Sequence, residues 1–120
     1  MTFDFNTPEK IRDLLQRGIV WERLIETADR HRVSPLLYRC LTRIRSSGIP
    51  GTALSRMTRA FHANARRNFL VTAELLQILE LFRTHGIRAI PYKGPVLSAA
   101  VYGDISMRQF DDLDIIVPVS

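Results

Sequence analysis

The chain has 120 residues, of which 46% are hydrophobic and 24% are charged, and its formal net charge is +5. This length and balance predict one compact unit and argue against a disordered chain. The single cysteine, Cys40, excludes an internal disulfide and a cysteine-based zinc site. The start of the chain lacks the features of a signal peptide and no apolar run is long enough to span a membrane, so we expect a cytoplasmic protein without a membrane partner.

Three short amphipathic helices are predicted in the first part of the chain. The triplet Thr7-Pro8-Glu9 supplies a cap, a first-turn proline and a first-turn acid, and Gly18 can end this helix. A second helix ends near His31, and a third begins at Ser34-Pro35 and is closed by Ser46-Ser47-Gly48. The apolar stripes of the second and third helices are Trp21, Leu24, Ile25 and Ala28, and then Leu37, Cys40, Leu41 and Ile44.

A long helix is predicted from about Thr52 to His85, because this stretch contains neither proline nor glycine. Its repeating stripe is Met57, Phe61, Asn64, Asn68, Val71, Leu75, Leu79 and Phe82. The second half is apolar on more than one side, so we expect it to lie in the middle of the fold. Asn64 and Asn68 are expected to hydrogen-bond across the helical bundle. Gly86 is a suitable stop.

After Gly86 the composition becomes that of short strands. Residues 87–92 predict a strand, Lys93-Gly94 a turn, Pro95 to about Val101 a short helix, and residues 111–119 a second strand. The predicted fold class is therefore α+β, with an N-terminal helical bundle over residues 1–85 and β-α-β elements over residues 86–120.

Two acids, Asp112 and Asp114, lie inside the apolar run DDLDIIV. Side chains in a strand alternate between faces, so both acids are expected on one face with their Cα atoms about 6.5 Å apart. Two carboxylates at this spacing can converge on a divalent cation. The alternative is a solvated sheet edge, where acids cost little and discourage aggregation, and the pattern alone does not decide between the two.

The turn Lys93-Gly94-Pro95 precedes the predicted short helix. Glycine permits a tight turn close to a ligand, proline preorganises the first helical turn, and the amides of Val96 and Leu97 are expected to face an anion. Lys93 adds a positive charge there. A glycine between a strand and a helix is also common in proteins that bind no phosphate.

KGPVLSAAVYGD (93–104), Arg108 and FDDLDIIV (110–117) together resemble the core of the bacterial nucleotidyltransferase-like family of uncharacterised proteins, a branch of the DNA polymerase β-type nucleotidyltransferase superfamily. The upstream segments VWERLIETADRHRVSPLLYRCL, NARRNFL, AELLQILELF and HGIRAIPYKG resemble the helical N-terminal region of that family, so the resemblance covers nearly the whole chain.

The resemblance implies a nucleotidyltransferase fold and magnesium-dependent transfer of a nucleotidyl group from a nucleoside triphosphate to an unidentified hydroxyl acceptor, with two metal ions. Asp112 and Asp114 would then be the catalytic metal ligands. Gly94 would form the phosphate turn, and Lys93 and Arg108 would contact the nucleotide.

Two features depart from the superfamily pattern. Proline stands at position 95, where the superfamily usually has a serine, so Lys93 is expected to replace part of the serine's phosphate contact. The third carboxylate of the superfamily matches no residue of this chain, so the sequence leaves open whether the chain is an active enzyme. Asp104 and Arg108 could orient a loop over the site or form an ordinary ion pair, and phosphate contact and structural pairing are equally good interpretations of Arg108.

The rest of the sequence suggests two alternatives to a complete enzyme. An exposed strand edge over Ile115 to Val117 predicts a truncated or split protein that pairs with itself or with another chain. The second alternative is a non-catalytic helical interaction module that carries a relic of the fold. Nucleic-acid binding by the basic residues of the long helix is disfavoured, because no aromatic stacking platform accompanies them. Those residues are Arg56, Arg59, His62, Arg66 and Arg67.

Overall fold

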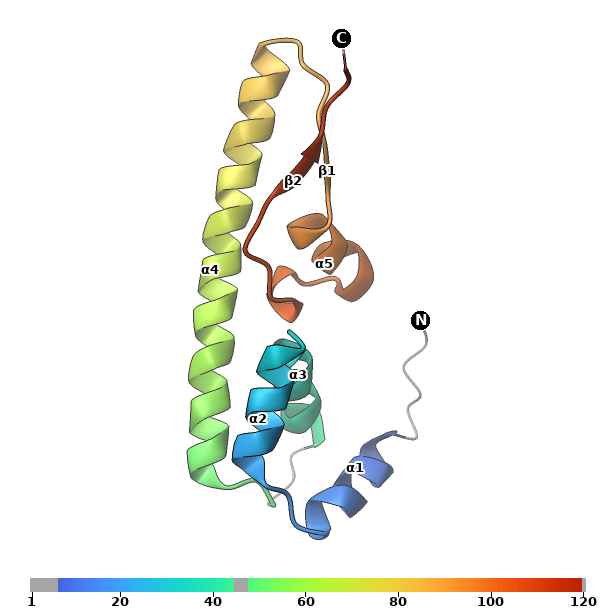
Figure 1. The fold of residues 1–120 in the computed structure, drawn as a ribbon, viewed down its shortest axis with the longest axis vertical. Coiled ribbons are helices and arrows are strands. Elements are labelled where there is room, and N and C mark those ends of the chain that lie inside the picture. Colours follow the sequence, from blue (N-terminus) through green and yellow to red (C-terminus); the bar gives the residue numbers. More distant parts are fainter. Residues whose placement is uncertain (1–6, 45–47, 120) are drawn as a thin grey trace. The chain divides into compact units, whose positions relative to one another are not determined.

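The computed structural model describes residues 7–44 and 48–119. In chain order its elements are α1 (Thr7–Gln16), α2 (Trp21–Arg30), α3 (Ser34–Ile44), α4 (Gly51–Thr84), β1 (Ile90–Tyr92), α5 (Gly94–Tyr102), the 3₁₀ turn η1 (Ile105–Met107) and β2 (Asp114–Ile116) (Figure 1). The described chain is mostly helical with one small antiparallel sheet, which agrees with the predicted α+β class. No helix among the described residues is long and apolar enough to cross a membrane.

The chain divides into two compact units, residues 1–60 and residues 61–120, and the boundary falls inside α4. The predicted division at residue 86 follows the change from helical to strand-like sequence, and it remains a prediction about domains.

The first unit has a small apolar core built from three helices. Leu15 of α1, Leu41 of α3 and Met57 of α4 are its buried centre. Partly buried side chains pack around them: Ile11, Ile19, Trp21, Ile25, Leu37, Tyr38 and Ile49. The helix bounds agree with those predicted from the caps and stripes, and Gly18, at φ 86°, lies just after α1. Of the predicted stop after α3, Ser46 and Ser47 lie outside the described residues.

Cys40 lies half-buried on α3. Burial raises the pKa of its thiol above the ordinary value, and the nearby Arg43 partly offsets this effect by favouring the thiolate. The thiol therefore stays protonated near neutral pH and is a weak nucleophile.

Helix α4 buries the predicted stripe but not the rest of its apolar surface. Every residue of the stripe is buried or half-buried, and Leu75 is only 4% exposed. On other sides of the helix, Phe69, Leu70, Leu76 and Leu81 are all more than half exposed. The expectation that the second half of α4 lies in the middle of the fold is therefore wrong for the described residues, since only one stripe meets the neighbouring elements.

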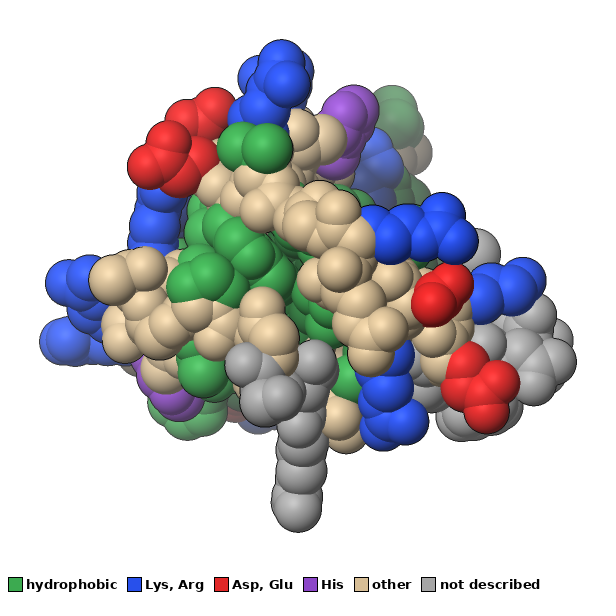
Figure 2. Space-filling model, turned by 90° about the horizontal axis from the view of Figure 1, so that it is seen from below, with side chains coloured by type: hydrophobic (Ala, Val, Ile, Leu, Met, Phe, Trp, Pro, Cys, Tyr) green, Lys and Arg blue, Asp and Glu red, His purple; other side chains and the backbone are tan. Residues whose placement is uncertain are grey.

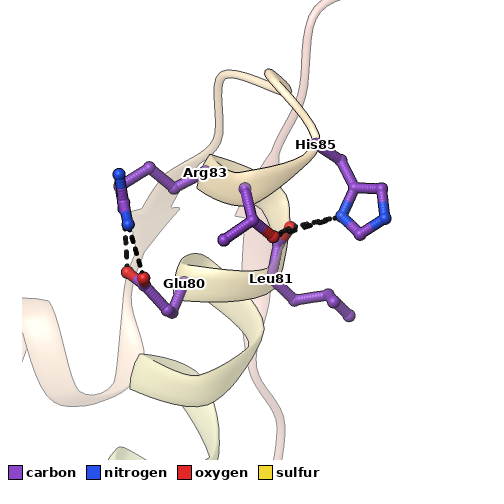
Figure 3. Close-up of polar contacts among 5 residues, drawn as sticks. Glu80, Leu81, Arg83 and His85 are labelled. Carbon is purple, nitrogen blue, oxygen red and sulfur yellow. Dashed lines mark hydrogen bonds and ion pairs between the residues drawn. The ribbon is translucent and has the colours of Figure 1, made fainter.

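The end of α4 is fixed by backbone capping at Gly86. Gly86 has φ 69°, its amide donates to the Arg83 carbonyl at 3.1 Å, and the amide of Ile87 donates to the Phe82 carbonyl at 2.9 Å. These two bonds form a Schellman cap, which satisfies carbonyls left over at the helix end. Figure 3 shows two further contacts, from Arg83 to Glu80 at 2.6 and 2.9 Å and from His85 Nδ1 to the Leu81 carbonyl at 2.9 Å. The hydrogen bonds from Arg83 lower the pKa of Glu80.

The β-α-β order after Gly86 is as predicted, but both strands are shorter than expected. β1 and β2 are antiparallel, and Ile90, Pro91 and Tyr92 lie opposite Ile116, Ile115 and Asp114 (Figure 1). β1 begins three residues later than predicted and ends at Tyr92 as predicted. β2 begins only at Asp114 because the chain turns at Lys93 into α5, which leaves no strand for residues 111–113 to pair with.

Candidate functional site

The two predicted metal ligands lie at the start of β2, but only one of them belongs to the strand. Asp114 is the first residue of β2 and is half-buried, whereas Asp112 lies in the preceding segment and is exposed. The prediction that strand alternation places both acids on one face therefore needs correction, because no ladder extends to Asp112. The two acids remain two residues apart at the end of the sheet from which α5 starts.

The phosphate turn predicted at Lys93-Gly94 lies directly beside the Asp112 segment. Tyr92 and Asp114 are the last pair of the ladder, so two further steps of the antiparallel register would place Gly94 opposite Asp112. The contacts agree: a Cβ built on Gly94 would lie 3.6 Å from the Asp112 carbonyl oxygen and 3.8 Å from the Phe110 ring. The structure thus brings together two motifs that are 18 positions apart in the sequence.

The backbone of the turn adopts conformations that side chains rarely allow. Gly94 has φ 44°, and Lys93 has φ 57° with ψ −157°, a region occupied almost only by glycine. Holding a lysine there costs on the order of 1–3 kcal/mol, which the surrounding structure must offset. Lys93 is exposed, and its Nζ lies 5.3 Å from the centroid of the Tyr92 ring. Strain of this kind concentrates at ligand-binding positions in proteins.

The first turn of α5 offers fewer free amides than the sequence suggested. The amide of Leu97 donates to the Lys93 carbonyl at 3.1 Å, so the expectation that it faces an anion is wrong. The amides of Gly94 and Val96 precede the first intrahelical bond and therefore have no acceptor within the helix. Pro95 has no amide hydrogen and is buried at the start of the helix. An anion at this end would meet the amides of Gly94 and Val96, with the positive end of the helix dipole behind them.

Arg108 follows η1, a turn that is capped at its N-terminal side by Asp104. Asp104 Oδ1 accepts hydrogen bonds from the amide of Ser106 at 2.8 Å and from its hydroxyl at 2.6 Å. Ser98 of α5 is fully buried and donates to the Asp104 carbonyl at 2.6 Å. These bonds fix the start of η1, and the orienting role considered for Asp104 stays a prediction. Arg108 itself is half-buried, and its Nη1 is buried with no hydrogen-bond partner among the described residues.

Helix α4 contributes three polar side chains that hold η1 and the loop that follows it. Asn64 Nδ2 donates to the carbonyls of Ser106 and Arg108 at 3.3 and 3.1 Å. Asn68 Nδ2 donates to the carbonyls of Ile105 and Arg108 at 2.9 and 2.6 Å. Both asparagines therefore bind an irregular loop, which corrects the prediction that they bond across a helical bundle. Their position inside an apolar stripe was the signal available in the sequence.

The third of these side chains is Arg67. It donates to the Phe110 carbonyl at 3.1 Å and forms an ion pair with Asp111. From the sequence, Arg67 was identified only as one of the basic residues of the long helix, so its contact with this loop was missed. Arg56, Arg59 and Arg66 are exposed on α4 and remain compatible with a solvated face. On the face shown in Figure 2, Lys and Arg side chains project at separate positions and do not gather into one patch.

Asp112 and Asp114 are carboxylates, a type of ligand that magnesium takes in proteins. Magnesium commonly binds through one or two carboxylates together with substrate phosphates and water, and Asp112 and Asp114 can supply the two carboxylates. Within residues 7–44 and 48–119, no group of three or more His, Cys, Asp or Glu residues could hold a metal. The two carboxylates are therefore too few to hold a metal by themselves, and they would fit one only if its other ligands came from a substrate and water.

Comparison with known proteins identifies a family. The model of the family described as "Uncharacterised nucleotidyltransferase" matches residues 17–120, and thus most of the helical region together with the whole β-α-β segment. No curated protein gave a significant match. No solved structure did so either. The chain belongs to the uncharacterised nucleotidyltransferase family.

Proposed function

We propose that the protein transfers a nucleotidyl group from a nucleoside triphosphate to a hydroxyl-bearing acceptor, with magnesium as cofactor. The observation that carries this proposal is the contact between the Gly94 turn and the Asp112 segment, at 3.6 Å from the built Cβ to the Asp112 carbonyl. Such a transfer needs the phosphates and the metal at one place, and the family match supports the same reaction class.

The triphosphate would bind at the first turn of α5. The amides of Gly94 and Val96, which have no acceptor within the helix, would donate to phosphate oxygens. Lys93 supplies a positive charge at the same turn, and Arg108, with its unpartnered Nη1, is a second candidate for a phosphate oxygen. Placing these donors before the substrate arrives lowers the reorganisation that the reaction requires.

Asp112 and Asp114 would hold the magnesium. A bound magnesium neutralises phosphate charge and lowers the pKa of an attacking hydroxyl. The carboxylates orient the ion, and the exposed position of Asp112 leaves room for the nucleotide beside it. The alternative of a non-catalytic helical module is not favoured by the family match, which extends across the acids and the glycine turn.

We further propose that the small sheet is completed by another chain, with a second copy of this protein as the first candidate. A two-stranded sheet is marginal by itself, and among the described residues no third strand joins it. Ile90 and Ile116 face each other across the ladder and are 64% and 53% exposed. A partner that added strands or covered this face would bury both side chains.

Calorimetric titration tests the proposed activity at the binding step. Each of the four ribonucleoside triphosphates is titrated with magnesium into the wild-type chain and into the double variant Asp112→Asn/Asp114→Asn. We expect magnesium-dependent binding of at least one nucleotide. The double variant should weaken it by at least roughly 100-fold, because even the outer-shell partners of metal ligands are worth about 10- to 100-fold.

The matched control is Asp13→Asn, the same chemical change at an exposed acid on α1 that pairs with Arg17 at 3.4 Å. It should bind nucleotide like the wild type. A folded wild-type chain that binds none of the four nucleotides would refute the proposal, and so would equal binding by the double variant.

A further inference from the structure

Asn64 and Asn68 lie in an apolar stripe of α4. Burying an amide there costs free energy unless the amide forms hydrogen bonds. Asn68 is completely buried, and its Oδ1 has no hydrogen-bond partner in the described part of the chain. Its Nδ2, in contrast, donates to two carbonyls. The donor half of the amide therefore accounts for the presence of asparagine at this position.

The four bonds of the two amides converge on one short segment. Asn64 and Asn68 reach the carbonyls of Ile105, Ser106 and Arg108, and the Arg108 carbonyl accepts from both. This segment belongs to no strand or α-helix, so its buried carbonyls depend on side chains for partners. An apolar residue at position 64 would take its side-chain donor from the Ser106 carbonyl, and one at position 68 would take it from the Ile105 carbonyl. In either case the Arg108 carbonyl would keep one of its two donors.

The segment held in this way carries the residues of the proposed site. Arg108 lies within it, and Asp112 follows four residues later, against the Gly94 turn. A metal–nucleotide site works only when its groups are held to within a fraction of an ångström, usually by a second layer of hydrogen bonds. On α4, the two asparagines are donors that supply such a layer to the Arg108 backbone.

We propose that Asn64 and Asn68 are positioning residues, which fix the loop from Ile105 to Asp112 on α4 so that Arg108 and Asp112 meet the nucleotide and its metal. This inference rests on the proposed function, because it concerns the binding of the same nucleotide. Neither asparagine is expected to touch the substrate.

The experiment compares three variants on α4. Asn64→Ala removes the amide, Asn64→Gln retains it on a longer side chain, and Gln77→Ala removes an exposed amide from the same helix as the control. Asn64 is preferred to the fully buried Asn68 because its side chain is only half-buried, so the variant should fold. Asn68→Ala is added as the stronger change.

Hydrogen exchange on the metal-free chain is the first measurement. Asn64→Ala should raise exchange selectively in residues 105–112 and leave the first unit unchanged, while Gln77→Ala should change neither. The second measurement is the magnesium-dependent nucleotide titration. Asn64→Ala should weaken binding by about 10- to 100-fold, with Asn64→Gln between it and the wild type.

The two proposals fail in different ways. A wild-type chain that binds no nucleotide refutes the proposed function and this inference together. Wild-type binding that Asn64→Ala leaves unchanged overturns the inference alone, whether or not the loop exchanges faster. Unchanged loop exchange in both Asn64→Ala and Asn68→Ala also overturns it, since the amides would then not hold the loop. If Asn68→Ala does not fold, the result with Asn64→Ala decides.

Discussion

Gly94 has a positive φ, which favours glycine, and it lies beside the segment that contains Asp112. Its φ of 44° strains any side chain, whereas a built Cβ makes only ordinary contacts, the closest at 3.6 Å. Gly94→Ala should therefore destabilise the fold by about 1–2 kcal/mol through backbone strain, without a clash. It should also weaken nucleotide binding, because relief of the strain moves the amides of the α5 first turn.

Gly103→Ala separates these two effects. Gly103 ends α5 at φ 70° with nothing within 4 Å of its built Cβ, so alanine there should cost a similar amount in stability. Urea unfolding gives the stability of both variants, and calorimetric titration gives their affinity for the magnesium nucleotide. A loss of affinity of equal size in both variants would mean that strain at Gly94 has no special bearing on the site.

At the scale of the element, α4 has one apolar side that is buried and another that is exposed. Leu75 is 4% exposed and its neighbour Leu76 is 62% exposed. Leu75→Ala should lower the free energy of unfolding by about 2–5 kcal/mol, because it leaves a cavity, and Leu76→Ala should change it by less than about 0.5 kcal/mol. Urea titration followed by circular dichroism measures both. Equal losses would show that the Leu76 side is also covered in solution.

The same elements show what the sequence could predict. Helix ends were predictable where a local signal acts, as at Ser34-Pro35 and Gly86, because capping depends on neighbouring residues only. The buried stripe of α4 followed from its period. The targets of Asn64 and Asn68 were not predictable, because they are carbonyls of an irregular loop about 40 residues away, whose conformation has no period. The strand lengths depended on where the partner strand turns, which is a tertiary property.

At the scale of the whole molecule, the exposed apolar side chains of the sheet should make the oligomeric state of the protein depend on its concentration. If a second copy completes the sheet, light scattering should show the mass per particle rising from that of a monomer as concentration increases. Ile116→Lys places a charge beside Ile90 and should shift the transition to higher concentration, since lysine on exposed strands opposes pairing.

Leu14→Lys is the control for that experiment, because Leu14 is 54% exposed on α1, in the other unit, and a general loss of surface hydrophobicity would act there equally. Leu14→Lys should not change the concentration at which the mass per particle rises. A monomer at every concentration would exclude a second copy as the partner. An equal shift in both variants would place the contact outside the sheet, and Ile90 and Ile116 would then be ordinary exposed residues.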